Sequence, residues 1–116
     1  MEKGERSPNQ NLIQRLFDAA CNEDWDLIDD DLIAELVGVT DGNRMAEELL
    51  VFVEDDNPNI RDVVATSLAV LGLTEEKVKD KVVSAMVKMA TGDEEIFPSG
   101  RAAVFLLKNK KMEEWV

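Results

Sequence analysis

The sequence predicts an all-α fold, and three observations point to it. Apolar residues recur at helical spacings of three, four and seven throughout residues 9–108. No alternating apolar and polar run bounded by hairpin turns occurs, and the chain has no tyrosine, so strand signals are weak. Its 116 residues fit one domain with its own core. We expect a polar, disordered tail over residues 1–8 and a single helical domain over 9–116.

Two helices are predicted before the turn at residues 40–43. The first, over 9–23, has these apolar residues on one face: Leu12, Ile13, Leu16, Phe17 and Ala20. The second, over 24–38, has one apolar stripe made of Trp25, Ile28, Leu32 and Leu36, and Gly38 is placed to end it. Cys21 follows the apolar spacing of the first helix, so we expect it in the core.

Four further helices are predicted. The third covers about 44–54, and the fourth begins with Asn57 as its cap and Pro58 as its first residue and runs to about Leu71. The fourth is apolar around most of its circumference, so we expect other helices to cover it on two sides. A fifth covers 74–90, a loop 91–100 and a sixth helix 101–108. Residues 109–116, with Trp115, are predicted to continue this helix or to cap the domain.

Charge is distributed unevenly along the chain, which has a net charge of −12. Residues 1–56 hold 16 acidic and 4 basic residues, whereas residues 57–116 hold 9 of each. Binding to nucleic-acid phosphates requires the opposite sign, so we expect no direct nucleic-acid binding. A basic protein partner is compatible with this charge.

Composition also argues against catalysis. The chain has no histidine, and it lacks the glycine-rich and paired-cysteine motifs of nucleotide and metal sites. We therefore expect neither an enzyme nor a bound cofactor or metal. No apolar run approaches the ~18 residues of a membrane span, so no membrane is expected. A single cysteine favours a reducing, cytoplasmic location.

The densest acidic cluster lies between residues 23 and 31. If Ile28 and Leu32 point inward, helix geometry turns the acidic side chains away from the core. The cluster is either a solvated face near a helix N-terminus or a docking surface for a basic partner. A calcium loop is disfavoured because the segment lacks a mid-loop glycine. The predicted partner-binding residues are Trp25, Asp26, Asp30 and Asp31.

An internal repeat organises the helices into pairs. Three windows, EDWDLID (23–29), DDNPNIR (55–61) and EIFPSGR (95–101), each begin with an acid and join two predicted helices. The second and third have proline at the fourth place, and the windows end on Asp29, Arg61 and Arg101. The stretch ELLVFVEDDNPNIRDVVATSLAVLG (48–72) resembles the HEAT-repeat family, whose turn reads D-x-x-P-x-[VI]-R. The residues that match are Asp55, Pro58, Ile60, Arg61, Leu68 and Gly72.

The third unit matches this pattern in part, and the first departs from it, with aspartates at residues 26 and 29 in place of proline and arginine. The resemblance implies a short right-handed α–α superhelix of about three HEAT-like helix pairs, with units at about 9–38, 43–72 and 74–108. A compact six-helix bundle is the alternative architecture.

The resemblance also implies contacts and a function. It implies an Asp–Arg ladder between units, in which Arg61 meets Asp24 or Asp29 and Arg101 meets Asp55 or Asp56. The function that it implies is protein–protein interaction through a stacked-helix surface, as an adaptor that is a monomer or a homo-oligomer. A regulatory subunit and a homo-oligomeric structural protein are alternatives, and a small enzyme is less favoured.

Overall fold

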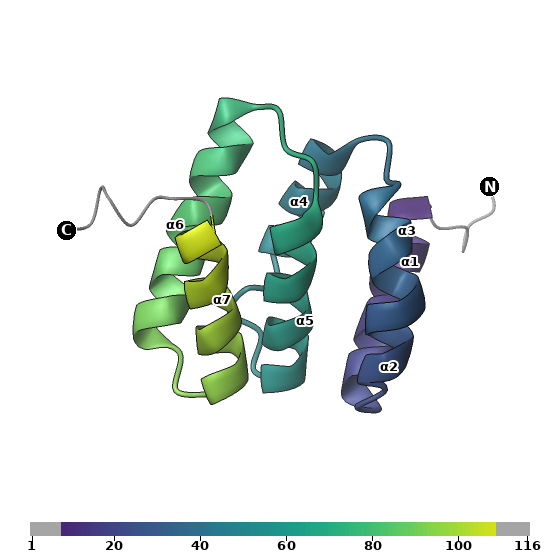
Figure 1. Cartoon of the computed structure of the whole chain (residues 1–116), viewed down its shortest axis with the longest axis horizontal. Coiled ribbons are helices and arrows are strands. Elements are labelled where there is room, and N and C mark those ends of the chain that lie inside the picture. The colour runs from purple at the N-terminus through teal and green to yellow at the C-terminus, as the bar shows by residue number, and fades with distance from the viewer. Residues whose placement is uncertain (1–7, 109–116) are drawn as a thin grey trace.

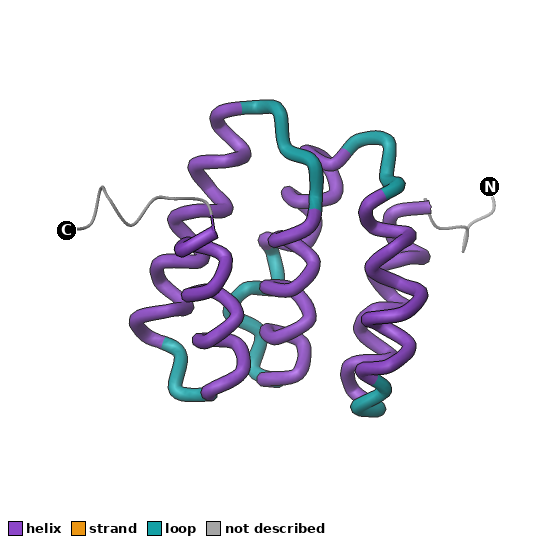
Figure 2. Tube along the Cα trace, viewed as in Figure 1, coloured by secondary structure: helices purple, strands orange, loops and turns teal. Residues whose placement is uncertain are grey.

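The computed structural model describes residues 8–108, and every regular element in that range is helical (Figures 1 and 2). The elements are α1 (Pro8–Cys21), α2 (Trp25–Leu27), the π-helical turn η1 (Ile28–Leu32), α3 (Ile33–Val37), α4 (Gly42–Leu50), α5 (Pro58–Val70), α6 (Glu76–Gly92) and α7 (Ile96–Lys108). The predicted all-α class is confirmed. The predicted tail over residues 1–8 lies outside the described residues except for Pro8, which begins α1, and the predicted cap over 109–116 lies outside them entirely.

Three helix pairs stand side by side along the longest axis (Figure 1). The first consists of α1 and the nearly continuous helix α2–η1–α3, the second of α4 and α5, and the third of α6 and α7. The main helix contacts fall within pairs or join neighbouring pairs: α5 contacts α1, α3 and α7, and α4 contacts α6. The second pair therefore lies in the middle.

Helix α5 is the centre of the core. Its cap forms as predicted, because the Asn57 side chain accepts a hydrogen bond from the Asn59 N–H at 2.9 Å, and Pro58 takes the first helical position. Seven of its residues are buried, namely Ile60, Asp62, Val63, Val64, Ala65, Ser67 and Leu68. Helices on two sides cover it, which confirms the expectation from its apolar circumference. No helix within residues 8–108 is both long enough and apolar enough to cross a membrane.

The predicted third helix is wrong in its bounds. Asp41 caps α4 by accepting from the Arg44 N–H at 3.1 Å, and residues 51–54 form turns instead of helix. Gly42 lies so close to the loop after α5 that an added Cβ would approach the Gly72 carbonyl oxygen to 2.3 Å. A glycine is therefore required there because backbone meets backbone.

Two other expectations are corrected. The predicted loop over 91–100 is helical from Ile96 onwards, with Pro98 as the third residue of α7. Proline is compatible with the first helical turn because the first N–H groups of a helix have no partner within it. Cys21, expected in the core, is exposed because it is the last residue of α1, where the chain turns away from the helix.

Candidate functional site

The acidic segment begins in a tight turn that ends α1. The Asp24 N–H donates to the Ala19 carbonyl at 2.8 Å and the Glu23 N–H donates to the Ala20 carbonyl at 3.0 Å. This pattern places Glu23 in the left-handed region, with φ of 58°. Asp24 then caps α2, because its Oδ1 accepts from the Leu27 N–H at 3.3 Å. Asp24 therefore acts at a helix terminus, and the predicted contact with Arg61 does not form.

A π-helical turn follows in the middle of the acidic cluster. The Ile33 N–H donates to the Ile28 carbonyl five residues earlier. In a regular α-helix, a residue four positions later lies about 40° further around the helix axis. The π-helical turn rotates less per residue and therefore offsets this drift. Ile28, Leu32 and Leu36 accordingly all stay buried, as predicted. Asp29, Asp30 and Asp31, which lie between Ile28 and Leu32 in the sequence, are exposed.

Four predicted residues form a surface that we call the acidic face: Trp25, Asp26, Asp30 and Asp31. The three aspartates are exposed, and Trp25 is half-buried against the core. Within residues 8–108 no ion pair involves any of these three aspartates. Trp25 and Asp26 lie on α2, and Asp30 and Asp31 lie on η1, so all four belong to the nearly continuous helix α2–η1–α3.

Little positive charge lies near the acidic face. Residues 8–41 contain nine acidic residues and a single base, Arg15. Arg15 pairs with Glu35, with Nη1–Oε1 at 2.8 Å and Nη2–Oε2 at 2.6 Å. This bidentate hydrogen bond lowers the pKa of the Glu35 carboxyl. Because its guanidinium is already engaged, Arg15 leaves most of the local negative charge uncompensated.

The acidic residues are not arranged as a metal site. Among residues 8–108 no group of three or more His, Cys, Asp or Glu side chains is placed to hold a metal ion. The acidic face therefore offers three exposed carboxylates, with the half-buried Trp25 on the same helical segment. Such a combination suits contact with a basic polypeptide.

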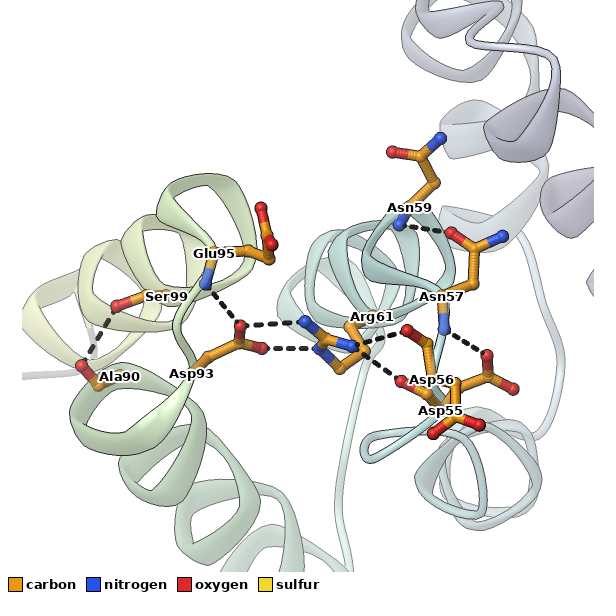
Figure 3. A network of polar contacts seen from close by, with 9 residues as sticks. All are labelled: Asp55, Asp56, Asn57, Asn59, Arg61, Ala90, Asp93, Glu95 and Ser99. Atoms are coloured by element: carbon orange, nitrogen blue, oxygen red, sulfur yellow. Dashed lines mark hydrogen bonds and ion pairs between the residues drawn. The ribbon is translucent and has the colours of Figure 1, made fainter.

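Arg61 joins the second and third pairs (Figure 3). Its Nε and Nη2 donate to the two carboxylate oxygens of Asp93 at 2.7 and 3.0 Å, and its Nη1 donates to the backbone carbonyls of Asp55 and Asp56 at 2.8 and 3.2 Å. The side chain of Asp93 is only 5% exposed and that of Arg61 17%. The hydrogen bond from Arg61 lowers the pKa of Asp93. This is a charge-assisted, bidentate and largely desolvated pair.

The predicted partners of Arg61, Asp24 and Asp29, are therefore wrong. Arg61 shares a face of α5 with Ala65, one turn later, and Ala65 lines a groove with α7. The arginine consequently points towards the third pair and away from the first. Asp55 and Asp56 do contact Arg61, although through their main-chain oxygens and not their carboxylates.

Arg101 was predicted to meet Asp55 or Asp56, and it pairs with Asp62 instead. Asp62 lies on α5, which packs directly against α7, so the arginine meets a residue of the neighbouring helix before it can reach the turn. Asp62 is 4% exposed. Desolvation raises the pKa of its carboxyl, Arg101 opposes this rise, and the negative charge of Asp29 adds to it. The exposed Asp29 thus faces the second pair without an ion pair among the described residues.

Further polar contacts join the second pair to the third. Lys81 on α6 pairs with Glu47 on α4 at 3.3 Å, and Lys88 pairs with Glu54. At the other end of these helices the Asn43 side chain accepts from the Thr74 and Glu75 N–H groups at 3.0 and 3.1 Å. These contacts fix α6 beside α4 along its length.

Sequence reasoning missed Asp93 and Asp62. Asp93 is followed by two further acids, Glu94 and Glu95, and the sequence does not show which of the three is buried. In the structure Asp93 accepts from the Glu95 N–H at 2.8 Å and pairs with Arg61. Asp62 did carry a signal, because it is an acid inside an apolar helix directly after Arg61. A buried position for such an acid implies a cationic partner.

The chain matches no protein-family model, no curated protein and no solved structure. The resemblance to the HEAT family therefore stays a prediction, and the function has to be argued from the surface itself.

Proposed function

We propose that this chain is a non-enzymatic, HEAT-like interaction module whose acidic face binds a basic protein partner. The observation that supports the proposal most is the exposure of Asp26, Asp30 and Asp31 without an ion pair among the described residues. Concentrated like charge destabilises a folded domain through self-repulsion, so a partner that relieves it is a physical reason for its presence.

The arrangement of the helix pairs supports the solenoid part of the proposal. Helix contacts pass from each pair to the next, and residue 61 links two successive pairs as a ladder arginine would. The π-helical turn supports the role of the acidic face, since such turns are rare and often occur at functional sites. A reducing, cytoplasmic location is part of this proposal, and the single cysteine of the chain supports it.

The test begins with a partner captured from the source cytosol and eluted by salt. We expect its affinity to fall by at least tenfold for the triple variant Asp26→Asn, Asp30→Asn, Asp31→Asn, since several close charge pairs are lost together. Association should also slow as salt rises, because exposed charges are screened beyond ~8–10 Å.

A matched control removes the same charge elsewhere. Glu75, Asp80 and Glu94 are exposed acids of the third pair, and their amide variants change the net charge by the same three units. If this control weakens binding as much as the triple variant does, net charge alone governs binding and the acidic face is not the site. Solution size measured on the same samples separates a monomeric adaptor or regulatory subunit from a homo-oligomeric structural protein.

A further inference from the structure

Helix α7 is apolar on two opposite sides. The side that packs against α5 and α6 consists of Pro98, Ala102, Phe105 and Leu106. At about 100° per residue, a second set of apolar residues falls within a single arc on the other side of the helix. This set, which we call the outer stripe, is Ile96, Phe97, Gly100, Val104 and Leu107. A helix that is apolar around its circumference is typical of one with neighbours on both sides, yet the outer stripe is exposed.

The outer stripe forms a large apolar patch. Its exposed fractions are 81% for Ile96, 69% for Phe97, 50% for Leu107 and 49% for Val104. At ~200 Å² for a large side chain, the exposed parts amount to about 500 Å². A contiguous apolar patch of this size in a highly charged chain indicates a surface that something covers.

A groove of about 610 Å³ borders the outer stripe, between α5 and α7, which lie side by side in Figure 1. Small residues create this groove, namely Ala65 and Ala69 on α5 and Gly100 on α7. A Cβ added at Gly100 would meet no atom within 4 Å, so the space above this glycine is open. A side chain from another helix can therefore enter at Gly100.

We propose that the outer stripe packs against the outer stripe of a second copy of this chain, with the two α7 helices antiparallel. The order of residues along the stripe supports this arrangement. Gly100 and Val104 lie at equal separations on either side of residue 102, and so do Phe97 and Leu107. A twofold axis at that level places Val104 of each copy over Gly100 of the other, so that a large residue meets a small one. A parallel pairing would instead set Gly100 level with Gly100 and leave the open space unfilled.

Charge at the two ends of α7 favours the same arrangement. Glu94 and Glu95 precede the helix, Lys108 ends it, and all three residues are exposed. Within residues 8–108 none of them forms an ion pair, whereas Arg101 is already paired with Asp62. An antiparallel contact brings the acidic start of one α7 beside the basic end of the other. Residues 109–116 hold two lysines and two glutamates, which leave this balance unchanged.

The third pair is also the part of the molecule where two copies can approach each other. Residues 57–116 hold 9 acidic and 9 basic residues, whereas two copies that met through residues 1–56 would bring a strong negative charge together. A contact through α7 buries about 1,000 Å² in total, close to the lower limit of specific interfaces. We therefore expect a reversible dimer that dissociates at micromolar concentrations.

The dimer does not depend on the proposed function. The first pair, which has the acidic face, lies at the other end of the longest axis from the third (Figure 1). A dimer through α7 therefore leaves the acidic face of each copy exposed and presents it twice to a partner.

Analytical ultracentrifugation of the whole chain, from micromolar to millimolar concentration, provides the test. The mass should rise with concentration from that of the 13.0 kDa chain to twice that value. Val104→Asp places a carboxylate in the centre of the contact, and it should weaken association at least tenfold. Val51→Asp makes the same change at a 77% exposed residue in the turn after α4, so this control should associate as the parent does.

A second variant and a spectroscopic control guard against loss of the fold. Leu107→Asp alters the outer stripe at a residue that is half-exposed and does not line the groove, and it should also weaken association. Circular dichroism verifies that each variant keeps the helical content of the parent.

Cross-linking tests the direction of the two helices. In the Cys21→Ser background, chains with Gly100→Cys should form disulfides with chains that have Val104→Cys, and faster than either chain does with its own kind. The antiparallel arrangement brings those two positions together, whereas a parallel one brings like positions together.

Three results would overturn the proposal. The parent chain could remain a monomer up to millimolar concentration, Val51→Asp could weaken association as much as Val104→Asp does, or like chains could cross-link faster than unlike ones. None of these results bears on the binding of a basic partner to the acidic face, so failure here is distinguishable from failure of the proposed function.

Discussion

The junction between the second and third helix pairs is rich in charged contacts, whereas the junction between the first and second pairs depends on apolar packing. Four ion pairs cross the former, involving Asp93 with Arg61, Asp62 with Arg101, Glu47 with Lys81 and Glu54 with Lys88. Within residues 8–108, no ion pair crosses the latter. There Phe17 meets the Phe52 ring edge-to-face at 4.8 Å, and the Asn57 amide donates to the Cys21 sulfur at 3.5 Å.

The residue at one repeated position explains much of this difference. Residue 61 is arginine in the second unit, and the corresponding residue 29 is aspartate in the first. Arg61 pairs with an acid of the next unit, whereas Asp29 adds negative charge near Asp62. The first pair is thus joined to the others mainly by its apolar face, and its Asp26, Asp30 and Asp31 form no ion pair among the described residues.

Replacing Arg61 should have the largest effect on stability. Arg61→Ala leaves the Asp93 carboxylate, only 5% exposed, without its bidentate donor, so we expect a loss of about 3 kcal/mol in the free energy of unfolding. Lys81→Ala removes an exposed pair at the same junction and should cost under ~0.5 kcal/mol. Denaturant melts measure both. Equal costs for the two variants would mean that burial of the pair has no consequence.

Gly42 tests the packing of the start of α4 against the loop that leads from α5 to α6. In Gly42→Ala the new methyl group meets the Gly72 carbonyl oxygen, and the backbone has to shift, at a cost of about 2 kcal/mol. Gly72→Ala is the matched control, because a Cβ there meets nothing within 4 Å. If the Gly42→Ala variant unfolds at the same denaturant concentration as the parent, the start of α4 and the loop after α5 are not held together.

The pH dependence of stability distinguishes Asp93 from Asp62. The folded pKa of Asp93 is lowered, so its contribution is present above the unfolded pKa of ~3.9 and is lost as the pH falls through the folded value. The folded pKa of Asp62 is raised, so protonation on acidification favours the folded state.

At acidic pH, the two asparagine variants should therefore change the pH dependence of the free energy of unfolding in opposite directions. Asp93→Asn should lose less stability than the parent as the pH falls below the unfolded pKa of ~3.9, and Asp62→Asn should lose more than the parent as the pH falls towards that value from above. Urea melts across this range measure both slopes. Parallel slopes for the two variants would contradict the opposite pKa shifts.

Asp29→Arg should have the smallest effect, and it sharpens the comparison by introducing a cation at the first junction. The substitution removes a negative charge near Asp62 and places a positive one there, so stability should rise by ~0.2–1 kcal/mol. Asp29→Asn is the control that removes the repulsion alone. An arginine variant less stable than the asparagine variant would show that residue 29 does not face the second pair.

Helix periodicity predicted the class of the fold, most helix positions and the central role of α5, because local apolar spacing carries that information. Periodicity failed where the direction of a side chain depended on the position of neighbouring helices. The direction of Arg61 is set by which side of α5 the third pair occupies, and no local pattern encodes that. The start of α7 was missed because Pro98 resembles a turn residue although the first helical turn accepts it.

The acidic face was predictable for a related reason. Asp26, Asp30 and Asp31 are exposed because the buried stripe of their own helix determines where they point. The groove between α5 and α7 was not predictable, because it requires small residues on two helices to face each other. Single-helix patterns predict the faces of one element and not the spaces between two.

Native-state hydrogen exchange of the whole chain tests the comparison most directly. Amides in separate cooperative units exchange with their own opening free energies, so the exchange pattern reports how tightly each pair is joined to the rest. We predict that the amides of α1 open at a clearly lower free energy than those of α5, α6 and α7, and that Arg61→Ala brings α6 and α7 down towards the value for α1. Equal protection of α1 and α5 in the parent chain would contradict the claim that the first pair is the more weakly joined.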